Sequence, residues 1–131
     1  MPHPVMFRDD DPGLARLRAI ALGFPGTCER IAWGRPTFRA PRMFAIYGGT
    51  AKVAGATLDQ PHSVLVKADP AELPALLADP RFFRPAYLGP HGWVGLDLTG
   101  APVDWREVTE LVDASWRQVA PRRRIAEFDG G

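Results

Sequence analysis

Arginine is the residue type in this sequence that is best placed to do chemistry. Arg35, Arg39 and Arg42 lie close together in a segment that reads as a β-hairpin. A guanidinium group binds phosphate or carboxylate through paired, planar hydrogen bonds, and a hairpin that carries arginine can bind the phosphates or enter a groove of DNA. The pattern therefore predicts a DNA-binding hairpin. Further positive charge is available from Lys52, Lys67, Arg122 and Arg123.

Exposed aromatic side chains offer a different chemistry, the recognition of a protein partner or a small ligand. Aromatic and arginine side chains dominate the binding energy of such surfaces. The candidates are Trp33, Tyr47, Tyr87 and Trp93. Three alternatives stay open for the arginine-bearing face of the hairpin: contact with nucleic acid, cover by a helix or a second subunit, and exposure to solvent. We expect a monomer or a homodimer.

Patterns typical of catalysis and metal binding are missing from the sequence. The histidines are far apart and follow no metal-ligand spacing, the serines stand outside any nucleophile elbow, and the glycines form no phosphate loop. A single cysteine excludes an internal disulfide and a multi-cysteine metal site within one chain. We therefore predict a binding module rather than an enzyme, with no metal and no cofactor. The residues concerned are His3, His62, His91, Ser63, Ser115 and Cys28.

Length and composition predict one folded domain over residues 1–131. Hydrophobic residues make up 46% of the chain, which is typical of a globular protein, and we place the core at about 12–124 with flexible ends. The net charge is only +1, so no overall field attracts nucleic acid, although fourteen of the sixteen basic residues are arginine. The sequence shows neither an apolar run of membrane-spanning length nor a secretion signal after Met1. We therefore expect a cytoplasmic protein that does not enter membranes.

Hydrophobic periodicity predicts three helices and about five strands. Helical spacing of apolar residues appears at 11–22, 69–78 and 104–120, and each segment begins near an aspartate that favours a helix start. Short alternating or apolar runs predict strands at 29–33, 37–40, 42–47, 63–67 and 93–98, with a short irregular one near 52–53. The order α-β-β-β-β-α-β-α predicts an α+β domain in two layers, with one antiparallel sheet and helices packed on a face.

The same periodicity predicts which side chains are buried. The apolar stripes of the first and last helices comprise Leu14, Leu17, Ala21, Phe24, Trp105, Val108, Val112, Trp116 and Val119. Alternation in the hairpin places Phe38, Ala40, Phe44 and Ile46 inward and Thr37, Arg39, Met43 and Tyr47 outward. A turn at 34–36 separates Trp33 and Phe38, both of which we expect in the core, and it leaves Arg35 without a structural role.

Glycine and proline predict where these elements end. Gly48 and Gly49 are expected to end the third strand, and residues 81–89 are expected to form an aromatic loop. Pro121 is expected to end the last helix. The basic run 122–124 then falls just beyond the negative end of that helix, where its charge is favourable.

The run from Trp33 to Arg39, WGRPTFR, resembles the signature of the MmcQ/YjbR family. Further similarity in the same order lies at 21–29, 64–67, 69–79, 92–94 and 116–123, so the resemblance covers about residues 14–124. It implies a small α+β domain, likened to double-wing DNA-binding proteins, with DNA as the partner and without catalytic residues or a cofactor. The chain departs from the pattern at Ala32, where many members carry histidine, and at 48–61, which is rich in glycine and alanine rather than basic.

Overall fold

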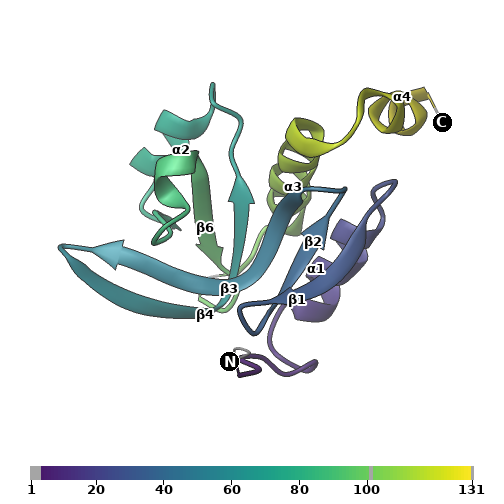
Figure 1. Ribbon diagram of the computed structural model, residues 1–131. Coiled ribbons are helices and arrows are strands. Elements are labelled where there is room, and N and C mark those ends of the chain that lie inside the picture. Colours follow the sequence, from purple (N-terminus) through teal and green to yellow (C-terminus); the bar gives the residue numbers. More distant parts are fainter. Residues whose placement is uncertain (1–3, 101, 131) are drawn as a thin grey trace.

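The computed structural model describes residues 4–100 and 102–130, and it contains a six-stranded antiparallel sheet with α1 and α3 packed on one face (Figure 1). The strands are β1 (Cys28–Ala32), β2 (Arg35–Arg39), β3 (Met43–Val53), β4 (Ala56–Lys67), β5 (Phe82–Phe83) and β6 (Trp93–Asp97). Their order in the sheet is β1-β2-β3-β4-β6-β5. The helices are α1 (Leu14–Leu22), α2 (Leu73–Ala78), α3 (Trp105–Val119), α4 (Arg122–Gly130) and the 3-10 turn η1 (Gly89–His91). The α+β class is confirmed, with β5 and α4 as additions to the predicted order.

The core lies between the sheet and the two long helices. Leu14 and Leu17 of α1 and Val108, Val112 and Trp116 of α3 are fully buried, which confirms both predicted stripes. The α3 helix begins as its sequence predicts, because the Asp104 carboxylate accepts hydrogen bonds from two backbone N–H groups of the first turn. Within residues 4–100 and 102–130, every helix is too short or too polar to cross a lipid bilayer.

The third strand does not end at Gly48 and Gly49, as the glycine pair predicts. Strand β3 continues to Val53 and pairs with β4 from Gly49 opposite Gln60 to the turn, so the two strands form a long arm that projects from the sheet (Figure 1). A β-bulge between Tyr47 and Gly49 lets the strand bend. Gly48 has a φ of 85°, a conformation that glycine adopts without strain.

A second bulge changes which hairpin side chains face the core. Phe38 pairs with Ala45 while Arg39 pairs with Met43, so Phe44 is an extra residue and its side chain joins Ala45 on the helix side. The predicted inward pairing of Phe44 with Ile46 is therefore wrong: Ile46 lies on the opposite face. Tyr47, predicted to face outward, is fully buried on the helix side, where its hydroxyl donates to the Pro12 carbonyl oxygen at 2.5 Å.

Burial of Tyr47 predicts an alkaline dependence of stability. Desolvation raises the pKa of its hydroxyl from 10.0 to about 12, with the carboxylates of Asp11 and Asp97 adding to the shift. The unfolded chain therefore loses this proton before the folded chain does, and the stabilisation present below pH 10 is lost as the pH rises towards 12. We expect the free energy of unfolding of Tyr47→Phe to fall less than that of the native protein as the pH rises from 10 towards 12. Urea unfolding of both proteins at several pH values between 9 and 12 measures it, and parallel curves would contradict it.

Two helices begin later than predicted, and a further helix follows α3. The α1 helix begins at Leu14 rather than near Asp11, and α2 begins at Leu73 because residues 69–72 form a preceding turn. None of the α2 leucines is fully buried, since this helix lies at the edge of the sheet. Pro121 ends α3 as predicted, but a new helix, α4, starts immediately, so Arg122 and Arg123 stand in its first turn rather than in a free tail.

Candidate functional site

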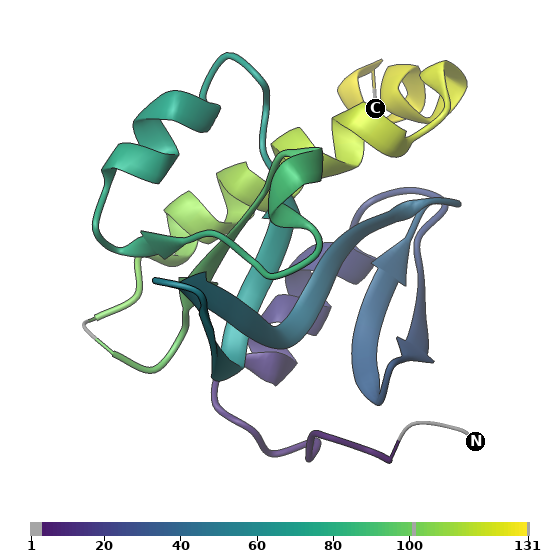
Figure 2. The same ribbon diagram turned by 60° about the vertical axis from the view of Figure 1, so that its left-hand side comes forward.

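The candidate site lies on the face of the sheet opposite α1 and α3, here called the outer face. Thr37, Ile46 and Leu65 are successive cross-strand partners on this side, and Ile46 and Leu65 form a small second core with Trp93. Residues 82–92 cross in front of β3 and cover one part of the outer face, while the β1–β2 hairpin stands beside them (Figure 2).

A groove of about 460 Å³ lies on the outer face. It is bounded by the β1–β2 turn, by β3 where the strand bends, and by residues 86–88. Its walls are mainly apolar, with one arginine among them. The lining residues are Met6, Trp33, Arg35, Ile46, Gly48, Gly49, Thr50, Leu65, Ala86, Tyr87 and Leu88.

Arg35 is the charged residue of this groove, and it is only 9% exposed. Within residues 4–100 and 102–130, its guanidinium has no carboxylate oxygen within 4.0 Å. Burial lowers its pKa, and attraction to Asp59 opposes that shift without forming an ion pair. The side chain packs against Gly48, because a Cβ atom there would lie 2.4 Å from Arg35 Nη1. Arginine keeps its charge at any physiological pH, so the groove contains a positive group that forms no ion pair with the described residues.

Two aromatic residues, one in the β1–β2 turn and one in residues 86–88, line the groove, and both have a positive backbone φ. Trp33 and Tyr87 have φ values of 54° and 67°, in the left-handed region that bulky residues rarely adopt. The β1–β2 turn consists of Trp33 and Gly34, not of residues 34–36 as predicted. Trp33 is consequently 52% exposed rather than part of the core, and Tyr87 is 89% exposed.

The four predicted aromatic contact residues therefore divide into two pairs. Trp33 and Tyr87 are exposed and line the same groove as Arg35. Tyr47 and Trp93 are buried, at 0% and 6% exposed, because one faces the helices and the other belongs to the second core. These two buried rings cannot serve as a contact surface for a partner.

Most of the predicted basic residues do come together on the outer face. Arg39 lies beside Thr37, to whose hydroxyl its Nε donates at 3.2 Å, and Arg42 and Lys67 line a second hollow next to Trp93. Lys52 lies apart on the β3–β4 arm, and Arg122 and Arg123 lie on α4. Sequence reasoning missed Arg30, a residue of β1 that pairs with Thr37 of β2. The alternation of side chains along β1 could have placed Arg30 on the outer face with Cys28 and Ala32.

Some arginines elsewhere on the protein are engaged with carboxylates, whereas others, such as Arg16, Arg106 and Arg122, form no ion pair among the described residues. Arg18 holds Glu29 at 2.9 Å on the helix side, Arg81 bridges Asp79 and Glu107, and Arg117 bridges two aspartates. Among the described residues, none of the outer-face basic groups Arg30, Arg35, Arg39, Arg42 and Lys67 forms an ion pair. The outer face is thus a basic surface whose charge is not neutralised by the fold.

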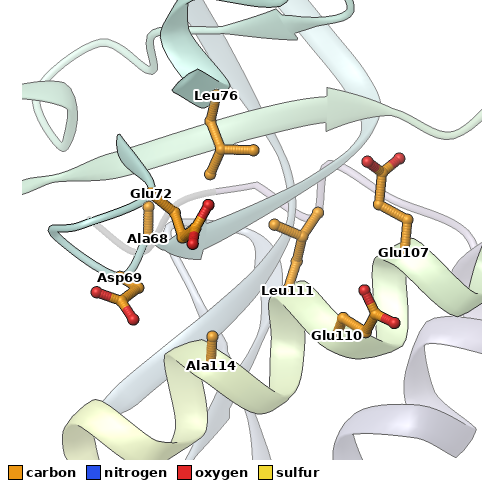
Figure 3. Close-up of a pocket in the computed structure, with 8 residues that line it drawn as sticks. All are labelled: Ala68, Asp69, Glu72, Leu76, Glu107, Glu110, Leu111 and Ala114. Atoms are coloured by element: carbon orange, nitrogen blue, oxygen red, sulfur yellow. The ribbon is translucent and has the colours of Figure 1, made fainter. Parts of the chain in front are cut away.

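A separate hollow between α2 and α3 has the opposite charge. Its volume is about 340 Å³, and Figure 3 shows Leu76 and Leu111 facing each other with carboxylates around them. Such a rim disfavours the binding of phosphate at this hollow. In the part of the chain that the structure describes, no group of three or more His, Cys, Asp or Glu could hold a metal ion. The carboxylates around the hollow between α2 and α3 belong to Asp69, Glu72, Glu107 and Glu110.

Comparison with known families agrees with the predicted resemblance. The model of the YjbR family matches residues 22–118, which is most of the chain. The chain belongs to the YjbR family. The match includes the YjbR segment that carries Trp33, Arg35, Gly48 and Tyr87, whereas Met6 lies outside it.

A solved structure supports the YjbR fold. A crystal structure of a protein from Pseudomonas syringae aligns with a TM-score of 0.60 at 15% sequence identity, over 80% of this chain and 97% of that one. At this identity the likeness concerns the fold alone. No curated protein matches the sequence.

Proposed function

We propose that this YjbR-family protein is a non-enzymatic DNA-binding module whose contact surface is the outer face. The observation that carries the proposal is that several basic side chains share one face of the sheet and none of them forms an ion pair among the described residues. Arg30, Arg39 and Lys67 stand together on the outer face without carboxylate partners among the described residues. Free arginine and lysine groups that share one face are suited to phosphate contacts along a nucleic acid backbone.

The contact would be made by a sheet surface rather than by a projecting wing. The β1–β2 hairpin carries the arginines but does not stand free, because the Met6 N–H donates to the Gly34 carbonyl oxygen and holds the N-terminal segment across its turn. The arm that does project, residues 49–60, carries Lys52 together with the exposed apolar residues Val53 and Leu58. The phosphate contacts are therefore assigned to the outer face, and Lys52 is a peripheral contributor.

We expect binding of duplex DNA to weaken steeply with salt. Contact with about four phosphates gives a slope of log K against log salt of about −3.6, which is roughly a hundredfold loss of affinity between 50 and 200 mM NaCl. Arg39→Gln should reduce this slope by about one unit, since it removes one phosphate contact. Fluorescence anisotropy of a labelled duplex measures both quantities.

Arg106→Gln is the matched control for this experiment. Arg106 is exposed on α3, away from the outer face, and forms no ion pair among the described residues. Arg106→Gln should leave the slope of log K against log salt unchanged. Because both variants remove one positive charge, a difference between them shows that the position of the charge matters. Absence of binding at low salt, or equal losses in the two variants, would refute the proposal.

A further inference from the structure

We propose that the groove around Arg35 binds a small planar organic anion, a flat ring that carries a carboxylate or a phosphate group. This function is separate from phosphate contacts along DNA, because it needs a ligand that enters the groove. Arg35 would bind the anionic group, and the ring would lie among the apolar walls between Trp33 and Tyr87.

Arg35 indicates the charge of the ligand. Buried charges in proteins are normally paired, because removing them from water without a partner is costly. Arg35 as a residue is only 9% exposed; its guanidinium packs on Gly48, opens into the groove, and makes no hydrogen bond or ion pair with the residues of 4–100 and 102–130. Its donors match a carboxylate or a phosphate in a paired arrangement. Asp59 attracts the guanidinium without contacting it, so a bound anion would supply the directly paired partner that is missing among the described residues.

The walls of the groove indicate the rest of the ligand. Ile46, Leu65 and Leu88 give the groove apolar walls, and the volume of about 460 Å³ is in the range of small-molecule sites. An inorganic ion would leave this surface in contact with water. A ligand that buries it must therefore carry an apolar body next to its charged group.

The exposed aromatic residues Trp33 and Tyr87 indicate that the apolar part of the ligand is flat. Among the described residues, three non-glycine residues have positive φ, and these two both line the groove. A two-residue turn with positive φ at both positions favours asparagine or glycine first, yet here the first residue is Trp33. Strained residues gather at ligand sites, and a half-exposed indole offers a face on which a planar ring can stack.

The native protein provides the first test, by isothermal titration calorimetry with four probes. These are 2-naphthoate, 2-naphthyl phosphate, the neutral 2-naphthylmethanol and inorganic phosphate. We expect one or both naphthyl anions to bind at least about tenfold more tightly than the alcohol, and their order shows whether carboxylate or phosphate is preferred. Equal affinity for the alcohol, or equally tight binding of inorganic phosphate, would overturn the proposal, as would no binding of either naphthyl anion at millimolar concentration.

Variants then test the role of Arg35. Arg35→Gln should lower the affinity for the preferred naphthyl anion by about tenfold, to that of the alcohol, and should leave the affinity for the alcohol unchanged. Arg106→Gln is the control that removes a positive charge outside the groove. An equal effect of both variants would contradict the assignment. The comparison of charged and neutral probes on the native protein stays decisive even if Arg35→Gln does not fold.

Nuclear magnetic resonance locates the probe independently. In nitrogen-15 spectra of the full chain, 2-naphthoate should shift the Trp33 indole N–H and the Gly48 and Thr50 amides. It should leave the amides of Glu72 and Glu110, in the acidic hollow, unmoved. The reverse pattern would overturn the proposal. DNA affinity is measured separately, so loss of one function does not decide the other.

Discussion

Replacing Trp116 with alanine should lower the free energy of unfolding by about 3–5 kcal/mol, the usual cost of removing a large aromatic side chain from a core. Trp116 is fully buried on α3. Its ring lies 5.1 Å from that of Phe24 and 5.3 Å from that of Phe128, centroid to centroid, and its indole N–H donates to the Pro25 carbonyl oxygen at 3.3 Å. One side chain thus joins α3, the end of α1 and α4.

Trp105 gives the matched control, because it is a tryptophan of the same helix that is only partly buried and stacks under Arg16. Trp105→Ala should cost about 1–2 kcal/mol, near the average for a point substitution. Unfolding in guanidinium chloride, followed by far-ultraviolet circular dichroism, measures both losses. Similar losses in the two variants would mean that Trp116 does not have the central position assigned to it.

The helices show what the sequence could predict about this fold. The spacing of Leu14, Leu17 and Ala21 and that of Val108, Val112 and Trp116 identified both buried stripes, because a 3.6-residue period is a local property of the chain. Strand β5 escaped prediction because Phe82 and Phe83 are a strand only by virtue of their pairing with β6. The fourth helix was missed because Pro121 reads as an end, although it also suits the start of the next helix.

The bulges explain why the burial pattern of the hairpin differs from the predicted alternation. A bulge shifts the alternation of side chains by one residue, and nothing in the local sequence around Phe44 announces it. Tyr47 therefore lies in the core rather than on the predicted surface, whereas Trp33 is exposed for another reason, its place in the two-residue β1–β2 turn. Arg35 was predicted to have no structural role, and it forms no ion pair with the described residues, but its burial depends on the bend of β3 at Gly48, which is a tertiary property.

Gly48 is the residue through which the fold and the groove are most directly connected. Its φ is 85°, and a Cβ atom would lie 2.4 Å from Arg35 Nη1 and 3.0 Å from the Pro61 carbonyl oxygen. Gly48→Ala therefore meets a backbone penalty of about 1–2 kcal/mol together with a steric penalty of about 1–3 kcal/mol in a well-packed position. We expect a total loss of about 3 kcal/mol in the free energy of unfolding, measured by urea unfolding.

Gly55 separates the two contributions. It lies at the tip of the β3–β4 arm with a φ of 81°, and nothing stands within 4 Å of its would-be Cβ atom. Gly55→Ala should therefore cost the backbone penalty alone, about 1–2 kcal/mol, and should leave the affinity for 2-naphthoate unchanged. Gly48→Ala should lose stability beyond that value and also weaken 2-naphthoate binding, because the guanidinium must leave its place to make room for the methyl group. If the two variants lose equal stability and both keep their affinity, then Arg35 does not pack on Gly48, and the bend of β3 does not position the charge of the groove.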